Sequence, residues 1–138
     1  MLRKLIDTNI FIDRFLKPDL YRDIFLSEGL AYLSAVVFME LRAGSHTREA
    51  VKAVYDLYRH FTRVGRLVLP SDADYERAGE IIAKLQTTRG YSVRKSASIT
   101  NDCLIASSAR SMGATLYTQN KKDFAAIQQI MPFNVIFV

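Results

Sequence analysis

Acidic and amide side chains follow or open apolar segments at several points of the sequence, where they could bind a cation. Residues 3–9 read RKLIDTN, so a short apolar run ends on Asp7. Asp102 lies at the start of the apolar segment NDCLIASSA, and Asn120 and Asp123 follow the run ATLYT. Mg²⁺ and Mn²⁺ prefer oxygen ligands, because both are hard cations. These residues would form a metal site if the fold brings them together.

Glu40 interrupts an apolar helical pattern in the segment AVVFMELRAG. Val36 and Val37 lie one helical turn before it and Leu41 follows it, so its carboxylate projects from an apolar face. A charge in such surroundings is costly unless it is paired with a cation or coordinates a metal. The neighbouring Arg42 points elsewhere on the helix, which favours metal coordination.

The other acids also have purely structural interpretations. Asp7 could cap a helix that begins at Thr8, and Asp102 could be stabilised in a first helical turn by the helix dipole. Convergence of Asp7, Glu40 and Asp102 would have a different consequence. Two unit charges about 4 Å apart repel by about 4 kcal/mol at an effective dielectric constant of about 20. Such carboxylates would therefore take up protons or hold a cation, and an all-oxygen cluster favours Mg²⁺ or Mn²⁺ over zinc.

The composition is that of a globular protein and favours one domain. The chain has 138 residues, of which 49% are hydrophobic and 24% charged, and no Pro-, Gly- or Ser-rich stretch divides it. Residues 1–138 are therefore expected to form a single domain around one core. The formal net charge of +5 gives weak support for binding to a polyanion such as a nucleic acid.

The N-terminal segment and the single cysteine indicate a cytoplasmic protein without a membrane partner. Asp7 and Asp13 interrupt the first apolar run before it reaches the length of a signal peptide, and no later run could span a bilayer. Cys103 has no disulfide partner and no CxxC or Cys/His pattern around it, so we expect a buried thiol and no zinc site. His46 and His60 lie outside the acidic motifs and are expected at the surface or its boundary.

Residue patterns along the chain predict strands that alternate with helices. The predicted strands lie around residues 5–6 and at residues 30–33, 66–69, 114–118 and 134–138. The predicted helices cover residues 10–15, a segment from about residue 18, residues 35–43, 47–61 and 72–88, a segment from residues 100–102 to Gly113, and a short segment before the last strand. This alternation predicts an α/β fold, a three-layer α/β/α sandwich with a mainly parallel central sheet. Such sheets bind ligands beyond the carboxyl ends of their strands, where Asp7 and Asn120 are expected.

Four segments of the chain resemble PIN domains in their order and spacing. They are LIDTNIFID near the N-terminus, SAVVFMELRAG, NDCLIASSARSMGATLYTQNKKDF and the terminal VIFV. The resemblance covers essentially the whole chain and extends in particular to the VapC toxins of bacterial and archaeal toxin–antitoxin pairs. It implies that Asp7, Glu40 and Asp102 are metal ligands, and that Thr8 and Asn9 orient the first of them.

The sequence departs from the PIN pattern at the fourth acidic position. In many PIN domains the strand after the third acid ends in Thr-x-Asp, whereas this chain has Thr118 and Asn120 there, with Asp123 one helical turn further on. Part of the family carries the same Asn followed by Asp-Phe, so the resemblance is compatible with activity. Either Asn120 or Asp123 would serve this position, and the candidate catalytic residues are Asp7, Glu40, Asp102 and Asp123. Thr118 and Asn120 would hold these carboxylates or contact phosphate.

The resemblance implies a Mg²⁺-dependent endoribonuclease that hydrolyses RNA phosphodiester bonds, with Mn²⁺ as an alternative ion. It also implies the toxin of a type II toxin–antitoxin system, which forms a homodimer and binds a cognate antitoxin. Two alternatives remain open. One is a PIN-like RNA-processing nuclease without an antitoxin, and the other is a non-catalytic PIN-like domain that binds RNA or protein.

Basic residues near Asp102 and Asp123 could guide the RNA backbone toward the acids, or could simply form solvated surface. They are Arg89, Arg94, Lys95, Lys121 and Lys122. Tyr91, in the same loop, could stack on an unpaired base. Residues 18–25 and 51–61 carry more large apolar side chains than one sheet needs, which indicates a groove or a dimer surface unless they all fill the core.

Overall fold

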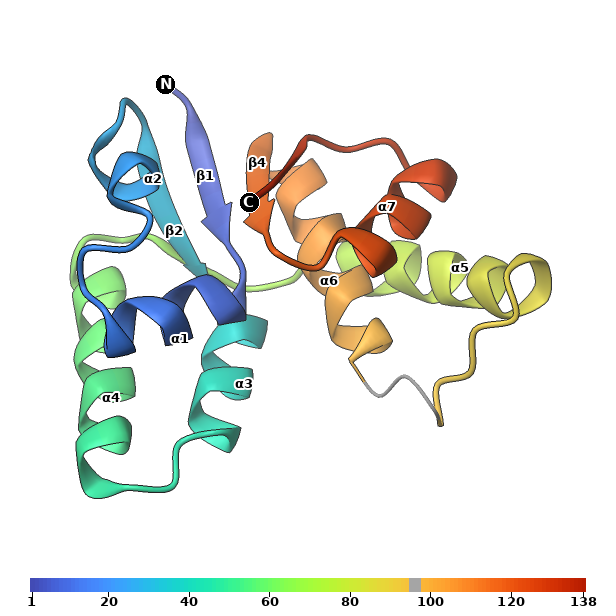
Figure 1. Cartoon of the computed structure of the whole chain (residues 1–138). Helices are drawn as coiled ribbons and strands as arrows, with labels where there is room; N and C mark the ends of the chain where they lie inside the picture. Colours follow the sequence, from blue (N-terminus) through green and yellow to red (C-terminus); the bar gives the residue numbers. More distant parts are fainter. Residues whose placement is uncertain (95–97) are drawn as a thin grey trace.

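The computed structural model describes residues 1–94 and 98–138 and contains a five-stranded sheet (Figure 1). All neighbouring strands pair in parallel, in the order β3-β2-β1-β4-β5. The strands are β1 (Arg3–Ile6), β2 (Leu30–Ser34), β3 (Leu67–Val68), β4 (Ala114–Thr118) and β5 (Val135–Phe137). The helices are α1 (Thr8–Leu16), α2 (Arg22–Leu26), α3 (Ala35–Ala43), α4 (Arg48–Arg63), α5 (Asp72–Thr88), α6 (Ile99–Ser111) and α7 (Lys121–Ile130).

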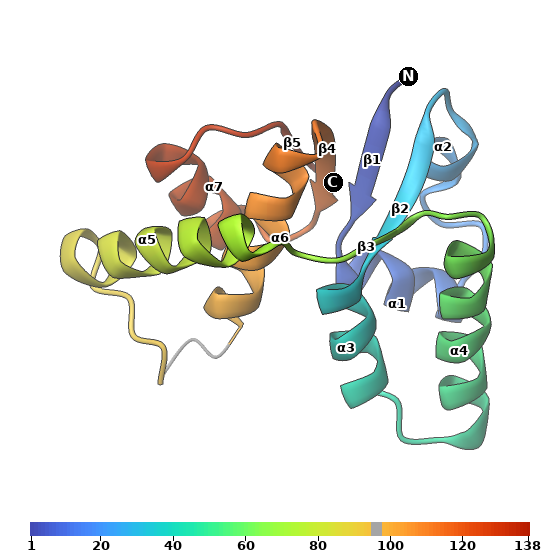
Figure 2. The same ribbon diagram turned by 180° about the vertical axis from the view of Figure 1, so that it is seen from behind.

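Helices cover the sheet on both faces, as the α/β/α prediction requires. Lys4, Leu5 and Ile6 of the central strand β1 are all buried, although successive side chains of a strand point to opposite faces. The view from behind shows α5 and α6 on one side of the molecule and α3 and α4 on the other (Figure 2). The predicted fold class is therefore confirmed.

The carboxyl ends of β1 and β4 lie side by side, which positions the acidic segments. Ile6 pairs with Tyr117 in the parallel register, and the backbone N–H of Asp7 donates to the carbonyl oxygen of Tyr117 at 3.0 Å. Asp7 therefore lies next to Thr118, the last residue of β4. The parallel pairing brings residue 7 to the same sheet edge as residues 118–120, even though more than a hundred residues separate them.

One predicted element begins at the wrong residue. A helix was expected from about residue 18, but α2 begins only at Arg22, and Leu20 lies outside it. The cause is Tyr21, whose φ of 56° and ψ of 30° place it in the left-handed region and so prevent a right-handed helix from passing through it. The other expected elements are present, with β3 and β5 shorter than predicted.

Expectations for individual side chains agree with the structure. Cys103 is fully buried in the core, and His46 and His60 are exposed. Among the residues that the structure describes, no helix combines the length and apolar character needed to cross a membrane.

Candidate active site

Asp7 is a buried carboxylate at the junction of β1 and α1. Only 6% of its surface is exposed. One carboxylate oxygen accepts a hydrogen bond from the backbone N–H of Thr8 at 2.8 Å, and the other accepts one from the Thr118 hydroxyl at 2.6 Å. The bond from Thr8 is the helix-capping contact, while the bond from Thr118 comes from the neighbouring strand. Both oxygens are thus fixed at the carboxyl edge of the sheet.

Asp102 and Asp123 share a single amide donor. Asp102 lies in the first turn of α6 and is 5% exposed. The Asn120 side-chain amide nitrogen donates to Asp102 at 3.2 Å and to Asp123 at 3.1 Å. The second oxygen of Asp123 accepts a hydrogen bond from the Tyr91 hydroxyl at 2.9 Å. Asn120 therefore joins the start of α6 to the start of α7.

Glu40 reaches the same region from α3. It is half-buried, and the Thr8 hydroxyl donates to its Oε1 at 2.6 Å while the Asn101 amide nitrogen lies 3.4 Å from its Oε2. The resemblance implied that Thr8 and Asn9 orient Asp7. The side chain of Thr8 instead holds Glu40, and only its backbone N–H contacts Asp7, while Asn9 is exposed.

The buried carboxylates are electrostatically unfavourable in their charged form. Burial is the main cause that raises the pKa of Asp7, Glu40 and Asp102 above the ordinary values. The pKa of Asp102 rises to about 8, because the charges of Asp7, Glu40 and Asp123 add to the effect of burial. Within residues 1–94 and 98–138, the ion pairs involve only Asp19, Asp56 and Asp74, and none involves an acid of this site. The described side chains therefore supply no cation that would offset these charges.

The chemistry of these groups fits a hard divalent cation. Asp7, Glu40 and Asp102 offer only oxygen donors, and a bound cation would favour the charged form of Asp102 against the burial and repulsion that raise its pKa. Their present arrangement is more open than a metal cluster. No group of three acidic, histidine or cysteine side chains in the described part of the chain is arranged to hold a metal ion. The carboxylate oxygens accept hydrogen bonds from neutral donors instead.

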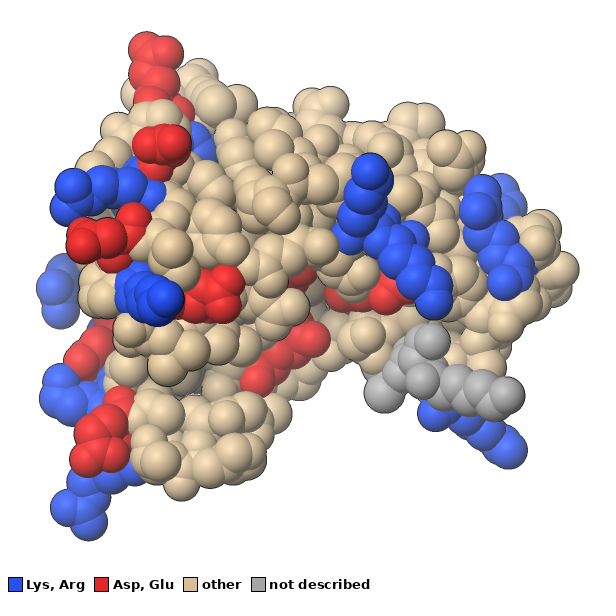
Figure 3. Space-filling model, in the orientation of Figure 1, with Lys and Arg blue, Asp and Glu red and all other residues tan. Residues whose placement is uncertain are grey.

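Basic side chains lie beside the acids. Lys121 and Lys122 are exposed in the first turn of α7, directly before Asp123, and Arg89 and Arg94 are exposed at and after the end of α5. In Figure 3, acidic side chains gather along a hollow across the middle of the molecule, and basic side chains flank it on the half that contains α7. Lys95 lies outside the described residues.

Two residues that contact the acids were not assigned this role from the sequence. Asn101 contacts Glu40, and its position beside Asp102 in the NDC segment was an available signal. Tyr91 was considered only as a residue that could stack on a base; in the structure its hydroxyl donates to Asp123, and its pKa rises to about 12 through burial and this hydrogen bond. No local pattern indicated that contact, because Tyr91 and Asp123 are 32 positions apart.

Solved structures with the same fold come from toxin–antitoxin complexes. A chain of VapBC2 from Rickettsia felis, solved with a promoter DNA fragment, has a TM-score of 0.72 and 24% sequence identity, with 99% of each chain covered. A chain of FitAcB from Neisseria gonorrhoeae has a TM-score of 0.68 and 22% identity, over 98% of this chain and 96% of the other. A chain of VapBC-5 from Mycobacterium tuberculosis has a TM-score of 0.66 and 20% identity, over 100% of both chains. At these identities the likeness shows a common fold.

The sequence itself matches a family model. No curated protein gives a significant match. The model described as PIN domain, however, matches residues 4–129, which include β2, β3, β4, all of β1 except Arg3, and all the acids described above. The chain therefore belongs to the PIN domain family.

Proposed function

We propose that this chain is a Mg²⁺-dependent endoribonuclease of the VapC type, the toxin of a type II toxin–antitoxin pair, and that its 138 residues act as a single domain. One observation carries the proposal. Asp102 is buried among three other carboxylates at the carboxyl edge of a parallel sheet, with no cationic side chain paired to it among the described residues. Membership of the PIN family supports the same activity.

In this proposal, different residues of the site would bind the ion, position its ligands and orient the attacking water. Asp7, Glu40 and Asp102 would hold the ion, with Mn²⁺ as an alternative, and a bound Mg²⁺ lowers the pKa of its water and neutralises charge on the phosphate. Thr118 fixes the carboxylate of Asp7 before any ligand binds. Glu40 is held by the Thr8 hydroxyl and the Asn101 amide, so it is suited to bind the ion through water or to position the attacking water. Asn120 fixes the remaining acids.

The basic residues at the start of α7 would bring the RNA backbone to this edge. Lys121 and Lys122 occupy a helix N-terminus, where the helix dipole disfavours cations, so helix stability does not account for them. An approaching phosphate would find both positive charges beside the acids. Arg89, Arg94 and Lys95 complete the proposed RNA-binding set. Contacts of this kind strengthen binding to any RNA sequence.

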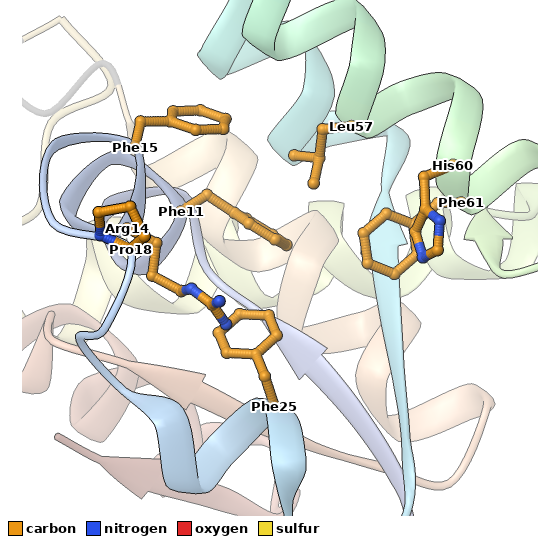
Figure 4. A pocket seen from close by; sticks show the side chains of 8 residues that line it. All are labelled: Phe11, Arg14, Phe15, Pro18, Phe25, Leu57, His60 and Phe61. Atoms are coloured by element: carbon orange, nitrogen blue, oxygen red, sulfur yellow. The ribbon is translucent and has the colours of Figure 1, made fainter.

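An apolar groove between α1, α2 and α4 is the proposed antitoxin-binding surface. Figure 4 shows aromatic rings from all three helices that point into it. The groove has a volume of about 300 Å³. Among its lining residues, the guanidinium of Arg14 lies over the Phe25 ring, 3.9 Å from the ring centre. Its lining residues are Phe11, Arg14, Phe15, Pro18, Phe25, Leu57, His60 and Phe61. An amphipathic helix could bury its apolar face there.

A second cavity links this groove to the acids. It has a volume of about 200 Å³ and lies between α1, α3 and α4, where Ile12, Leu41 and Val54 form part of its wall. Phe15 lines both cavities, and Glu40 lines the second. A bound segment that follows α1 from the groove would therefore reach the acidic site.

RNA cleavage tests the nuclease. Purified protein is incubated with a structured RNA in Mg²⁺, in Mn²⁺ and in EDTA, beside Asp7→Asn and the surface control Asp56→Asn in α4. We expect cleavage by the wild type and the control that requires the ion, and a loss of about a hundredfold or more with Asp7→Asn. Absence of cleavage by a folded, antitoxin-free wild type would refute the nuclease and leave a non-catalytic binding domain.

The partners need separate measurements. Light scattering on the purified protein tests the proposed homodimer, for which two copies per particle are expected. Co-expression with the product of a small neighbouring reading frame tests the antitoxin, and Phe25→Asp in the groove should abolish the complex while Asp56→Asn should not. An active nuclease that forms no such complex would indicate the RNA-processing alternative.

A further inference from the structure

Three polar side chains from distant parts of the chain meet beside the acidic site. The Tyr21 hydroxyl donates to a carboxylate oxygen of Asp13 at 2.9 Å, and the Gln119 side-chain amide donates to the same oxygen at 2.6 Å. The Gln119 amide also donates to the Tyr21 hydroxyl oxygen. Asp13 lies in α1, Tyr21 directly before α2, and Gln119 in the loop between β4 and α7. We call this three-residue cluster the Gln119 clamp.

The clamp holds Gln119, which lies between two residues that donate hydrogen bonds to the acids of the site. Thr118 donates to Asp7, and Asn120 donates to Asp102. The loop between them is short and closed on itself, because the backbone N–H of Asn120 donates to the Thr118 hydroxyl at 3.0 Å. A shift of Gln119 would therefore move both donors with respect to their carboxylates.

The backbone of Tyr21 shows that the clamp is a built feature. Its φ of 56° lies in the left-handed region, which a large non-glycine side chain adopts rarely and only where its surroundings hold it there. That constraint comes from the hydroxyl, which donates a hydrogen bond to Asp13 and accepts one from Gln119, and from packing of the ring against the core. The α2 helix then begins at the next residue, with the Ile24 N–H bonded to the Tyr21 carbonyl at 3.0 Å.

We propose that Asp13, Tyr21 and Gln119 are positioning residues that fix the loop at residues 118–120 and thereby set the affinity of the site for its divalent ion. The inference rests on the proposed metal-dependent nuclease and adds residues that lie outside its ligand set. The clamp touches neither the ion nor the RNA. It acts only through Thr118 and Asn120 on the carboxylates.

Binding of Mn²⁺ to the RNA-free protein tests the clamp directly. Calorimetric titrations compare the wild type with Tyr21→Phe, which removes only the hydroxyl, with Gln119→Met, which keeps the length without the amide, and with the double variant. Direct hydrogen-bond partners of metal ligands change metal affinity by about 10- to 100-fold, and the clamp acts one contact further out, so we expect losses of about three- to tenfold. The double variant should lose little more than either single variant, because the three residues act as one unit. Tyr75→Phe, on an exposed tyrosine of α5, is the matched control and should bind Mn²⁺ like the wild type.

Cleavage kinetics separate positioning from general damage to the fold. If the clamp acts through the ion, saturating Mg²⁺ should restore kcat in Tyr21→Phe while the KM for RNA stays at the wild-type value. Unchanged Mn²⁺ affinity in both clamp variants, with normal binding by the wild type, would overturn the clamp alone. A loss of affinity that is accompanied by a loss of kcat at saturating Mg²⁺ would also overturn it. Failure of the wild type itself to bind Mn²⁺ would overturn the proposed function, and the clamp with it.

Discussion

Replacement of Asp102 by Asn should stabilise the protein in the absence of metal. The side chain is 5% exposed, and its pKa of about 8 means that the charged form is strongly disfavoured in the folded state. Each pKa unit corresponds to about 1.4 kcal/mol. Keeping Asp102 protonated in the folded protein at neutral pH, when its ordinary pKa is 3.8, therefore lowers the free energy of unfolding by at most about 4 kcal/mol. Asn keeps an oxygen that accepts from Asn120 but adds a donor that needs a partner, so we expect a gain of roughly 1–3 kcal/mol.

The sign of the pH dependence follows from the raised pKa. Between about pH 4 and about pH 8, Asp102 is ionised in the unfolded chain but retains its proton in the folded protein, which therefore binds more protons. The contribution of Asp102 to the free energy of unfolding of the wild type therefore falls as the pH rises through this window. The advantage of Asp102→Asn should thus be small near pH 4, grow toward pH 8 and stay constant above it.

Urea denaturation followed by circular dichroism measures this difference. Wild type and Asp102→Asn are compared in EDTA across the pH window and then with Mg²⁺ at neutral pH. A ligand that binds only the folded state raises its stability, so Mg²⁺ should stabilise the wild type and leave the variant nearly unchanged. Asp56→Asn is the control, because Asp56 is exposed and hydrogen bonds from Lys52 and Arg59 lower its pKa. The reasoning is refuted if Asp102→Asn is less stable than the wild type in EDTA, or if its advantage shrinks as the pH rises.

Four further substitutions test other parts of the molecule. Lys121→Ala and Lys122→Ala should each weaken RNA binding for all sequences and reduce the slope of log affinity against log salt by about one. Asn120→Asp replaces a shared donor with a charge beside Asp102, so it should destabilise the metal-free protein by about 1–3 kcal/mol and increase the stabilisation by Mg²⁺ in thermal melts. Lys4→Met should cost about 2–4 kcal/mol in urea denaturation, because the buried ammonium donates to two backbone carbonyls and a hydroxyl at the end of α2.

Each of these expectations has a clear opposite. Lys52→Ala in α4 is the control and should leave the slope of log affinity against log salt unchanged. If both lysine variants of α7 also keep the wild-type slope, the RNA does not bind at the start of α7. An Asn120→Asp protein with unaltered stability would show that the shared amide does not matter for the acids. A Lys4→Met protein as stable as the wild type would mean that water replaces the ammonium at the carbonyl groups.

The helices and strands were predictable because their signals are local. The apolar run before Asp7, the capping Ser34 before α3 and the Gly113 after α6 all mark element ends within a few residues. The start of α2 was not predictable in this way. Residues 18–25 carry helical apolar spacing, but the left-handed conformation of Tyr21 depends on hydrogen bonds with Asp13 and Gln119, and the latter is 98 positions away.

The candidate acids and three of their hydrogen-bond partners, Thr8, Thr118 and Asn120, were named from the sequence, whereas Asn101 and Tyr91 were not. A carboxylate beside apolar residues is visible in a local pattern, as with Glu40. A threonine that donates to such an acid has no distinctive local pattern. Thr118 reaches Asp7, 111 positions away, only because β1 pairs with β4. The resemblance to PIN domains assigned Thr118 to the site, but it carried no information on Tyr91 or Gln119.

The departure from the family pattern at residue 120 has a physical explanation in the same network. An acid there would put another charge beside Asp102, whose pKa already rises to about 8 under three neighbouring charges. Asn120 instead places one amide between Asp102 and Asp123 and donates to both. Asp123 lies one turn along α7, where its other oxygen accepts a hydrogen bond from the Tyr91 hydroxyl. The negative charge at this edge is kept, while the two acids gain a neutral donor that reduces the cost of holding them together before an ion binds.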